Sequence, residues 1–64
     1  MGYKIKELRE AKHMTQEELS AKSGVSRGTI SALENNTARA TTTKTLVNIA
    51  KALDSTVDQL FISP

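Results

Sequence analysis

The chain has 64 residues, no cysteine and a formal net charge of +2, with 9 Lys and Arg against 7 Asp and Glu. This length allows one domain of marginal stability, and the absence of cysteine excludes disulfides and thiolate metal sites. No apolar run approaches the ~18 residues of a membrane span, and no signal peptide is visible, so we expect a cytoplasmic protein. The small positive charge permits nucleic-acid binding without requiring it.

The spacing of apolar residues is helical throughout, and it predicts an all-α fold of five short helices in a single domain, residues 1–64. Each helix is too short to be stable alone in water, so tertiary packing must support it. The first helix spans about residues 4–13, with Ile5 and Leu8 directed inward. Its basic residues are assigned to the solvent-facing side: Lys4, Lys6, Arg9 and Lys12.

The second predicted helix has clear signals at both ends. Thr15 followed by Glu18 matches a capping box, in which each side chain binds a free backbone N–H of the other residue. Leu19 is the apolar anchor, and Gly24 suits the end of the helix because it reaches positive φ without a Cβ clash. Only residues 24–26 then separate this helix from the next, which is typical of a helix–turn–helix.

The third predicted helix lies within residues 25–36, VSRGTISALENN. Ser26 is its N-cap, and Val25 packs just before it. Ile30 and Leu33 form the side that faces the core. The first turn is different, because its residues are small, polar or basic and add nothing to a core: Arg27, Gly28 and Thr29.

Two more helices complete the predicted fold. Thr42 caps a fourth helix over about residues 43–53, which carries the most regular apolar stripe in the chain: Leu46, Ile49, Ala50 and Leu53. Thr56 caps a last short helix that contains Val57, Leu60 and Phe61.

Residues 16–35, QEELSAKSGVSRGTISALEN, resemble the helix–turn–helix of the lambda-repressor/Cro/Xre family. The residue types agree with the family pattern at several positions: Gln16, Leu19, Gly24, Ile30, Leu33, Glu34 and Asn35. Residues 45–61, TLVNIAKALDSTVDQLF, look like the family's fourth and fifth helices. The resemblance covers about residues 4–61 and implies a lambda-repressor-like domain that binds double-stranded DNA.

In such a motif the third helix enters the major groove with its N-terminal end first. The side chain of Arg27 can span O6 and N7 of a guanine, and Gly28 lets the helix end approach the bases closely. The base-reading residues are therefore predicted to be Arg27, Gly28, Thr29 and Ser31. Contacts to DNA phosphates are expected from Gln16, Ser26, Asn36, Thr37, Arg39 and Lys44.

The resemblance also implies a homodimer, because one short recognition helix reads only a few base pairs. A dimer would bind a palindromic operator. We expect the protein to act there as a transcriptional repressor. The predicted dimer interface is the apolar end of the chain: Val57, Leu60, Phe61 and Ile62. The same residues could instead complete the core of one chain.

Other classes of function fit the sequence less well. A protein-interaction module, such as an antitoxin or a partner that sequesters a regulator, is the main alternative. Non-specific DNA coating would need more cations than the net charge provides. The lone His13 and the serines show no triad spacing, so we expect no enzyme. We likewise expect no metal, cofactor, small-molecule ligand or membrane partner.

Overall fold

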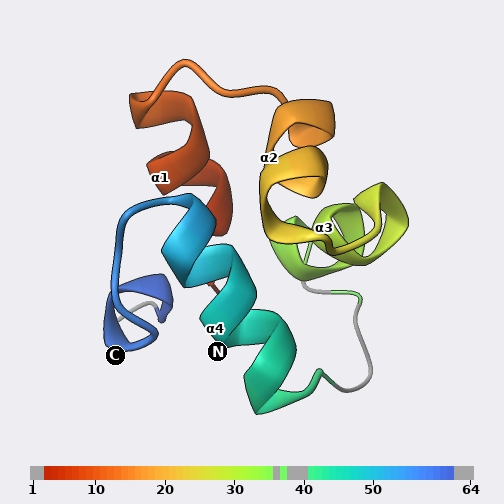
Figure 1. The fold of residues 1–64 in the computed structure, drawn as a ribbon, viewed down its shortest axis with the longest axis vertical. Helices are drawn as coiled ribbons and strands as arrows, with labels where there is room; N and C mark the ends of the chain where they lie inside the picture. Colours follow the sequence, from red (N-terminus) through yellow and green to blue (C-terminus); the bar gives the residue numbers. More distant parts are fainter. Residues whose placement is uncertain (1–2, 36, 38–40, 62–64) are drawn as a thin grey trace.

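The computed structural model describes residues 3–35, 37 and 41–61. In these ranges the chain forms α1 (Ile5–Ala11), α2 (Gln16–Ser23), α3 (Arg27–Glu34), α4 (Thr43–Ala52) and a closing 3-10 turn, η1 (Asp58–Leu60). Helix α2 packs against both α3 and α4, α1 contacts α3, and η1 contacts α4. Figure 1 shows α3 crossing near the end of α2. The predicted all-α fold is confirmed.

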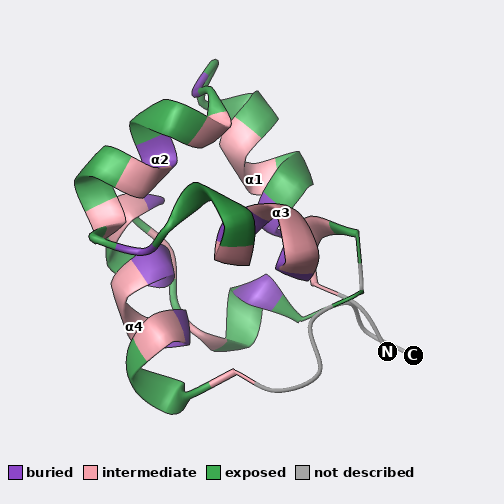
Figure 2. Ribbon diagram, turned by 90° about the vertical axis from the view of Figure 1, so that its right-hand side faces the viewer, coloured by how far each residue is buried: buried purple, intermediate pink, exposed green. Residues whose placement is uncertain are grey.

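One core joins all of these elements. Its buried apolar side chains are Ile5, Met14, Leu19, Val25, Ile30, Leu33, Leu46, Ile49, Ala50, Leu53 and Leu60. Leu8 is only half-buried and packs against this cluster. Figure 2 shows that the buried positions lie on the helix faces turned toward one another, while the outer turns are exposed. The periodic apolar positions of the sequence therefore do form the core. Met14, in the loop after α1, is also a core residue and was not predicted.

Helix α1 is shorter than the predicted span of residues 4–13. Lys4 precedes the helix as its N-cap, and Lys12 follows it as the C-cap. His13 has a φ of 54°, which is left-handed, while its N–H still donates to the carbonyl oxygen of Glu10 at 3.0 Å. The helix ends because this left-handed residue turns the chain toward α2.

The predicted helix caps are present. The backbone N–H of Thr15 donates to Glu18 Oε1 at 3.0 Å, and that of Glu18 donates to Thr15 Oγ1 at 3.1 Å, which completes the capping box. The hydrogen bond from the Thr15 backbone N–H to the carboxylate, helped by the Thr15 side chain, lowers the pKa of Glu18 below its ordinary value. Gly24 adopts a φ of 73°, and Thr42 Oγ1 accepts from the backbone N–H of Thr45 at 3.1 Å.

The predicted last short helix is present as a single 3-10 turn, η1, which ends before Phe61. Thr56 does cap it, accepting from the backbone N–H of Gln59 at 3.3 Å. Phe61 is already extended and forms an isolated antiparallel bridge with Tyr3. Their rings are in contact, with centroids 5.4 Å apart and planes tilted by 38°. Pairing with the start of the chain therefore replaces a further helical turn.

Leu60 is a core residue and offers no surface to a second chain. Its side chain is 0% exposed, and its carbonyl oxygen accepts from the backbone N–H of Lys4 at 2.6 Å. The predicted dimer interface is corrected at this position. Val57 is half-buried and Phe61 is 38% exposed, while Ile62 lies outside the described residues.

Across the part of the chain that the structure describes, no helix is long and apolar enough to cross a membrane.

Candidate nucleic-acid interface

The turn between α2 and α3 is held by a compact set of hydrogen bonds. The backbone N–H of Gly24 donates to the carbonyl oxygen of Ser20 at 2.9 Å. The hydroxyl of Ser20 donates to the carbonyl oxygen of Val25 at 2.7 Å, and Ser23 Oγ accepts from the Val25 N–H at 3.1 Å. The Val25 side chain itself is buried in the core. Polar side chains and one apolar anchor thus set the angle between the two helices.

Helix α3 begins with an exposed polar turn. Ser26 caps it, since its Oγ accepts from the backbone N–H of Thr29 at 3.3 Å and lies 2.8 Å from Thr29 Oγ1. Arg27 and Gly28 are exposed. A Cβ on Gly28 would meet no heavy atom within 4 Å. Internal packing therefore does not require a glycine here, and the space beside Gly28 is open.

The four predicted base-reading residues lie in the N-terminal half of α3. From the helix period, Gly28 and Ser31 lie on the side away from the buried Ile30 and Leu33 and Arg27 flanks that side, whereas Thr29 lies next to Leu33. They differ in how free their polar groups are. Thr29 and Ser31 are half-buried, and the Ser31 hydroxyl accepts from the Asn35 side-chain amide at 3.3 Å. A role in base reading stays a prediction for all four residues: Arg27, Gly28, Thr29 and Ser31.

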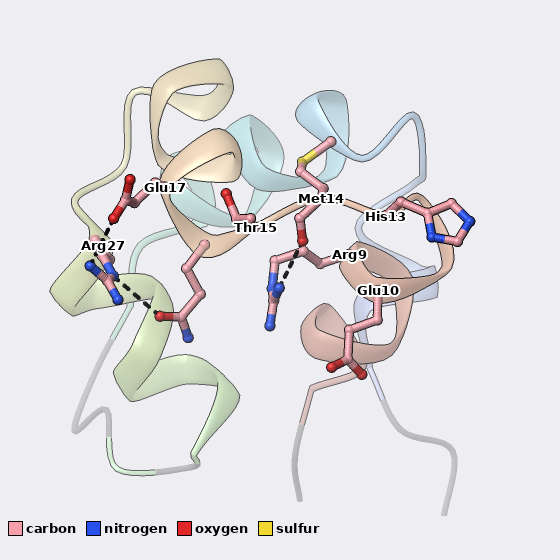
Figure 3. Close-up of a pocket in the computed structure, with 8 residues that line it drawn as sticks. Arg9, Glu10, His13, Met14, Thr15, Glu17 and Arg27 are labelled. Carbon is pink, nitrogen blue, oxygen red and sulfur yellow. Dashed lines mark hydrogen bonds and ion pairs between the residues drawn. The ribbon is translucent and has the colours of Figure 1, made fainter.

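The guanidinium of Arg27 is turned toward the start of α2. Its Nη1 lies 3.2 Å from Glu17 Oε1, and its Nε donates to Gln16 Oε1 at 3.4 Å. Figure 3 shows Arg27 and Glu17 pointing toward each other. The two side chains are 62% and 76% exposed, so solvent screens their attraction.

A second ion pair, which was not predicted from the sequence, joins α1 to α3. Arg9 Nε donates to Glu34 Oε2 at 2.8 Å, and Arg9 Nη2 to Glu34 Oε1 at 3.2 Å. Arg9 Nη1 also donates to the carbonyl oxygen of Met14 at 2.7 Å. The side chains of Arg9 and Glu34 are only 12% and 2% exposed. The assignment of Arg9 to the solvent-facing side of the first helix is therefore wrong.

Gln16 joins the two ion pairs into one network. Its side-chain amide Nε2 donates to Glu34 Oε1 at 2.9 Å, while its Oε1 accepts from Arg27. Burial raises the pKa of Glu34, but the hydrogen bonds from Arg9 and Gln16 outweigh it and bring the pKa below the ordinary value. The charged carboxylate orients the Gln16 amide so that its oxygen faces Arg27.

Those predicted phosphate contacts that the structure describes lie at or near helix ends. Gln16 opens α2, Ser26 caps α3 and the exposed Lys44 lies in the first turn of α4. Backbone N–H groups at helix N-termini favour anions. The Thr37 backbone N–H donates to the carbonyl oxygen of Ala32 at 2.8 Å. Two further predicted contacts, Asn36 and Arg39, lie outside the described residues.

An open groove of about 540 Å³ runs beside this network, between the end of α1 and the starts of α2 and α3 (Figure 3). It is lined by Arg9, Glu10, His13, Met14, Thr15, Gln16, Glu17 and Arg27. In the described ranges, no three His, Asp or Glu side chains gather as a metal site would require.

Two helices joined by a tight turn, the second presenting a polar and basic N-terminus, define a helix–turn–helix DNA-binding domain. Comparison with known families agrees, since the sequence model of the helix-turn-helix family (HTH_3) matches residues 5–60. The chain belongs to this family of Cro/C1-type domains, as the resemblance predicted. The family consists of DNA-binding regulators and is not typically enzymatic. No curated protein and no solved structure matches the chain.

Proposed function

We propose that the protein is a sequence-specific regulator of transcription that binds a palindromic operator as a dimer and represses. The observation that carries this proposal is the exposed first turn of α3. Arg27 and Gly28 lie there outside the core, directly after the hydrogen-bonded turn that joins α2 to α3. Repression is the simplest outcome for such a domain, because a protein that occupies DNA blocks access to it.

Base reading is assigned to four residues in the N-terminal half of α3: Arg27, Gly28, Thr29 and Ser31. An arginine at the leading end of a recognition helix suits the O6 and N7 acceptors of guanine. The open space beside Gly28 leaves room for a base edge or a thymine methyl. The short hydroxyl side chains reach less far, so we expect their contributions to be smaller.

Phosphate binding is assigned to the helix ends that surround this face. The described members are Gln16, Ser26, Thr37 and Lys44, and the assignment extends to Asn36 and Arg39. Since the net charge is only +2, a few placed cations and helix N-termini must supply the attraction to the DNA backbone.

Dimerisation is assigned to the surface where Phe61 pairs with Tyr3. Val57 and the partly exposed Phe61 remain available there after Leu60 is taken into the core, and Tyr3 extends the aromatic area beside Phe61. Ile62 is kept in the proposed interface. In a two-fold dimer the two recognition helices would enter successive major grooves, about 34 Å apart.

Selection of bound sequences from random double-stranded DNA tests the function, and sedimentation of the resulting complex tests the dimer. We expect a palindromic consensus bound by two chains. One chain on each tightly bound site would reject the dimer. Failure to bind any duplex at low salt would reject DNA binding and leave the protein-interaction module as the better reading.

A further inference from the structure

Two neighbouring glutamates at the start of α2 do different things. Glu18 is committed to the capping box with Thr15, so its substitution would weaken the helix itself. Glu17 takes no part in that cap, and its Oε1 lies 3.2 Å from Arg27 Nη1. An exposed carboxylate beside the DNA-binding face is costly for a DNA-binding protein, because it repels phosphates. Its position therefore calls for a reason connected with Arg27.

The contacts of Arg27 leave part of its guanidinium available. Its Nε donates to Gln16 and one N–H of its Nη1 to Glu17. The N–H groups of Nη2 and the second N–H of Nη1 are not used in these two bonds. A guanidinium fork needs two parallel N–H groups to bind O6 and N7 of guanine. Arg27 can thus be held by α2 from one side while it reads a base from the other.

We propose that Glu17 is a specificity-determining residue, which positions Arg27 for a base edge and suppresses its use on phosphates. This inference rests on the proposed DNA-binding function. Paired with Glu17, the guanidinium gains less from an anionic phosphate, which any DNA sequence provides. A guanine edge is neutral and is bound through hydrogen-bond geometry, so the nearby carboxylate penalises it less. Glu17 therefore lowers non-specific binding more than specific binding.

The test compares Glu17→Gln with the unmodified protein on the selected duplex and on a scrambled duplex, over a range of salt concentrations. Glu7→Gln is the matched control, since it removes one exposed carboxylate from the first turn of α1 and changes the net charge equally. We expect Glu17→Gln to raise affinity for the scrambled duplex about two- to five-fold, the range of an exposed ion pair. The slope of log affinity against log salt should steepen by roughly 0.9, as for one added phosphate contact.

Affinity for the selected duplex should change by less than the affinity for the scrambled one, so the ratio of the two falls. In an Arg27→Ala background, Glu17→Gln should no longer change that ratio, because the residue it positions is gone. A ratio that is unchanged, or that rises, would overturn the proposal, as would equal effects of Glu17→Gln and Glu7→Gln. If the unmodified protein binds neither duplex, the proposed function itself fails, which is a separate result.

Discussion

The two arginine–glutamate pairs of this domain have the same chemistry in opposite surroundings. The pair between Arg9 and Glu34 is nearly buried and bidentate, whereas the pair between Arg27 and Glu17 is more than half exposed. A buried pair is costly to disrupt, because removal of one partner leaves the other charge without compensation. An exposed pair is weak and can exchange partners. The inner pair therefore suits a structural role and the outer pair suits a binding surface.

The two pairs should differ most in how much the free energy of unfolding falls when the carboxylate of each is removed. We expect Glu34→Ala to lower the free energy of unfolding by about 3–5 kcal/mol, which approaches the whole stability of so small a domain. Glu17→Ala should lower it by less than about 1 kcal/mol. Chemical denaturation followed by circular dichroism measures both. Equal losses in the two variants would contradict the distinction between the pairs.

Removal of the outer arginine should affect DNA binding and leave folding almost unchanged. We expect Arg27→Ala to weaken binding to the selected duplex by about 1–3 kcal/mol and to relax the preference at one base pair in each half-site. Binding to scrambled DNA should fall much less. Titrations of both duplexes at one salt concentration measure the two effects. A large fall in thermal stability would show that Arg27 belongs to the structural network.

The inner pair should also make stability depend on acidity. The pKa of Glu34 in the folded chain lies below its ordinary value of 4.5, so the folded state favours the charged carboxylate. Its contribution to stability is complete above the pKa of the unfolded chain and is lost as the pH falls through the lower folded value. Melting temperatures recorded from pH 7 downward should fall less steeply for Glu34→Gln than for the unmodified protein. The pKa of Glu18 is also lowered in the folded chain, so part of the dependence of melting temperature on pH remains in both proteins. Parallel curves would contradict the assignment.

A phosphate contact should behave differently from the base-reading arginine. Lys44 is exposed in the first turn of α4. We expect Lys44→Ala to weaken all sequences about equally and to reduce the salt slope by roughly 0.9. Lys51→Ala, at the other end of the same helix, is the control for the loss of one positive charge. A loss confined to the selected duplex would mean that Lys44 reads bases.

The parts of the domain that could be predicted from the sequence depend on local signals. The caps of α2 and α4, the left-handed Gly24 and the apolar faces of α3 and α4 all arise from residues a few positions apart. These signals define the helix–turn–helix and place Arg27 at the leading end of α3.

The features that were missed depend on contacts between distant residues. The Arg9–Glu34 pair joins positions 25 residues apart, and the bond from Gln16 to Glu34 joins positions 18 apart. No spacing on one helix reveals such pairs. Phe61 was placed in the last helix for the same reason, since its extended conformation depends on pairing with Tyr3, which is distant in the sequence.

The central claim is that α3 reads DNA bases through Arg27, and a cycle of changes on both molecules tests it most directly. The guanine assigned to Arg27 is replaced by 7-deazaguanine, which lacks the N7 acceptor, and both duplexes are titrated with the unmodified protein and with Arg27→Ala. The account predicts that the base change weakens the unmodified protein clearly, within the roughly 1–3 kcal/mol of a bidentate contact, and leaves Arg27→Ala unaffected. Equal losses in both proteins would show that Arg27 does not contact that base.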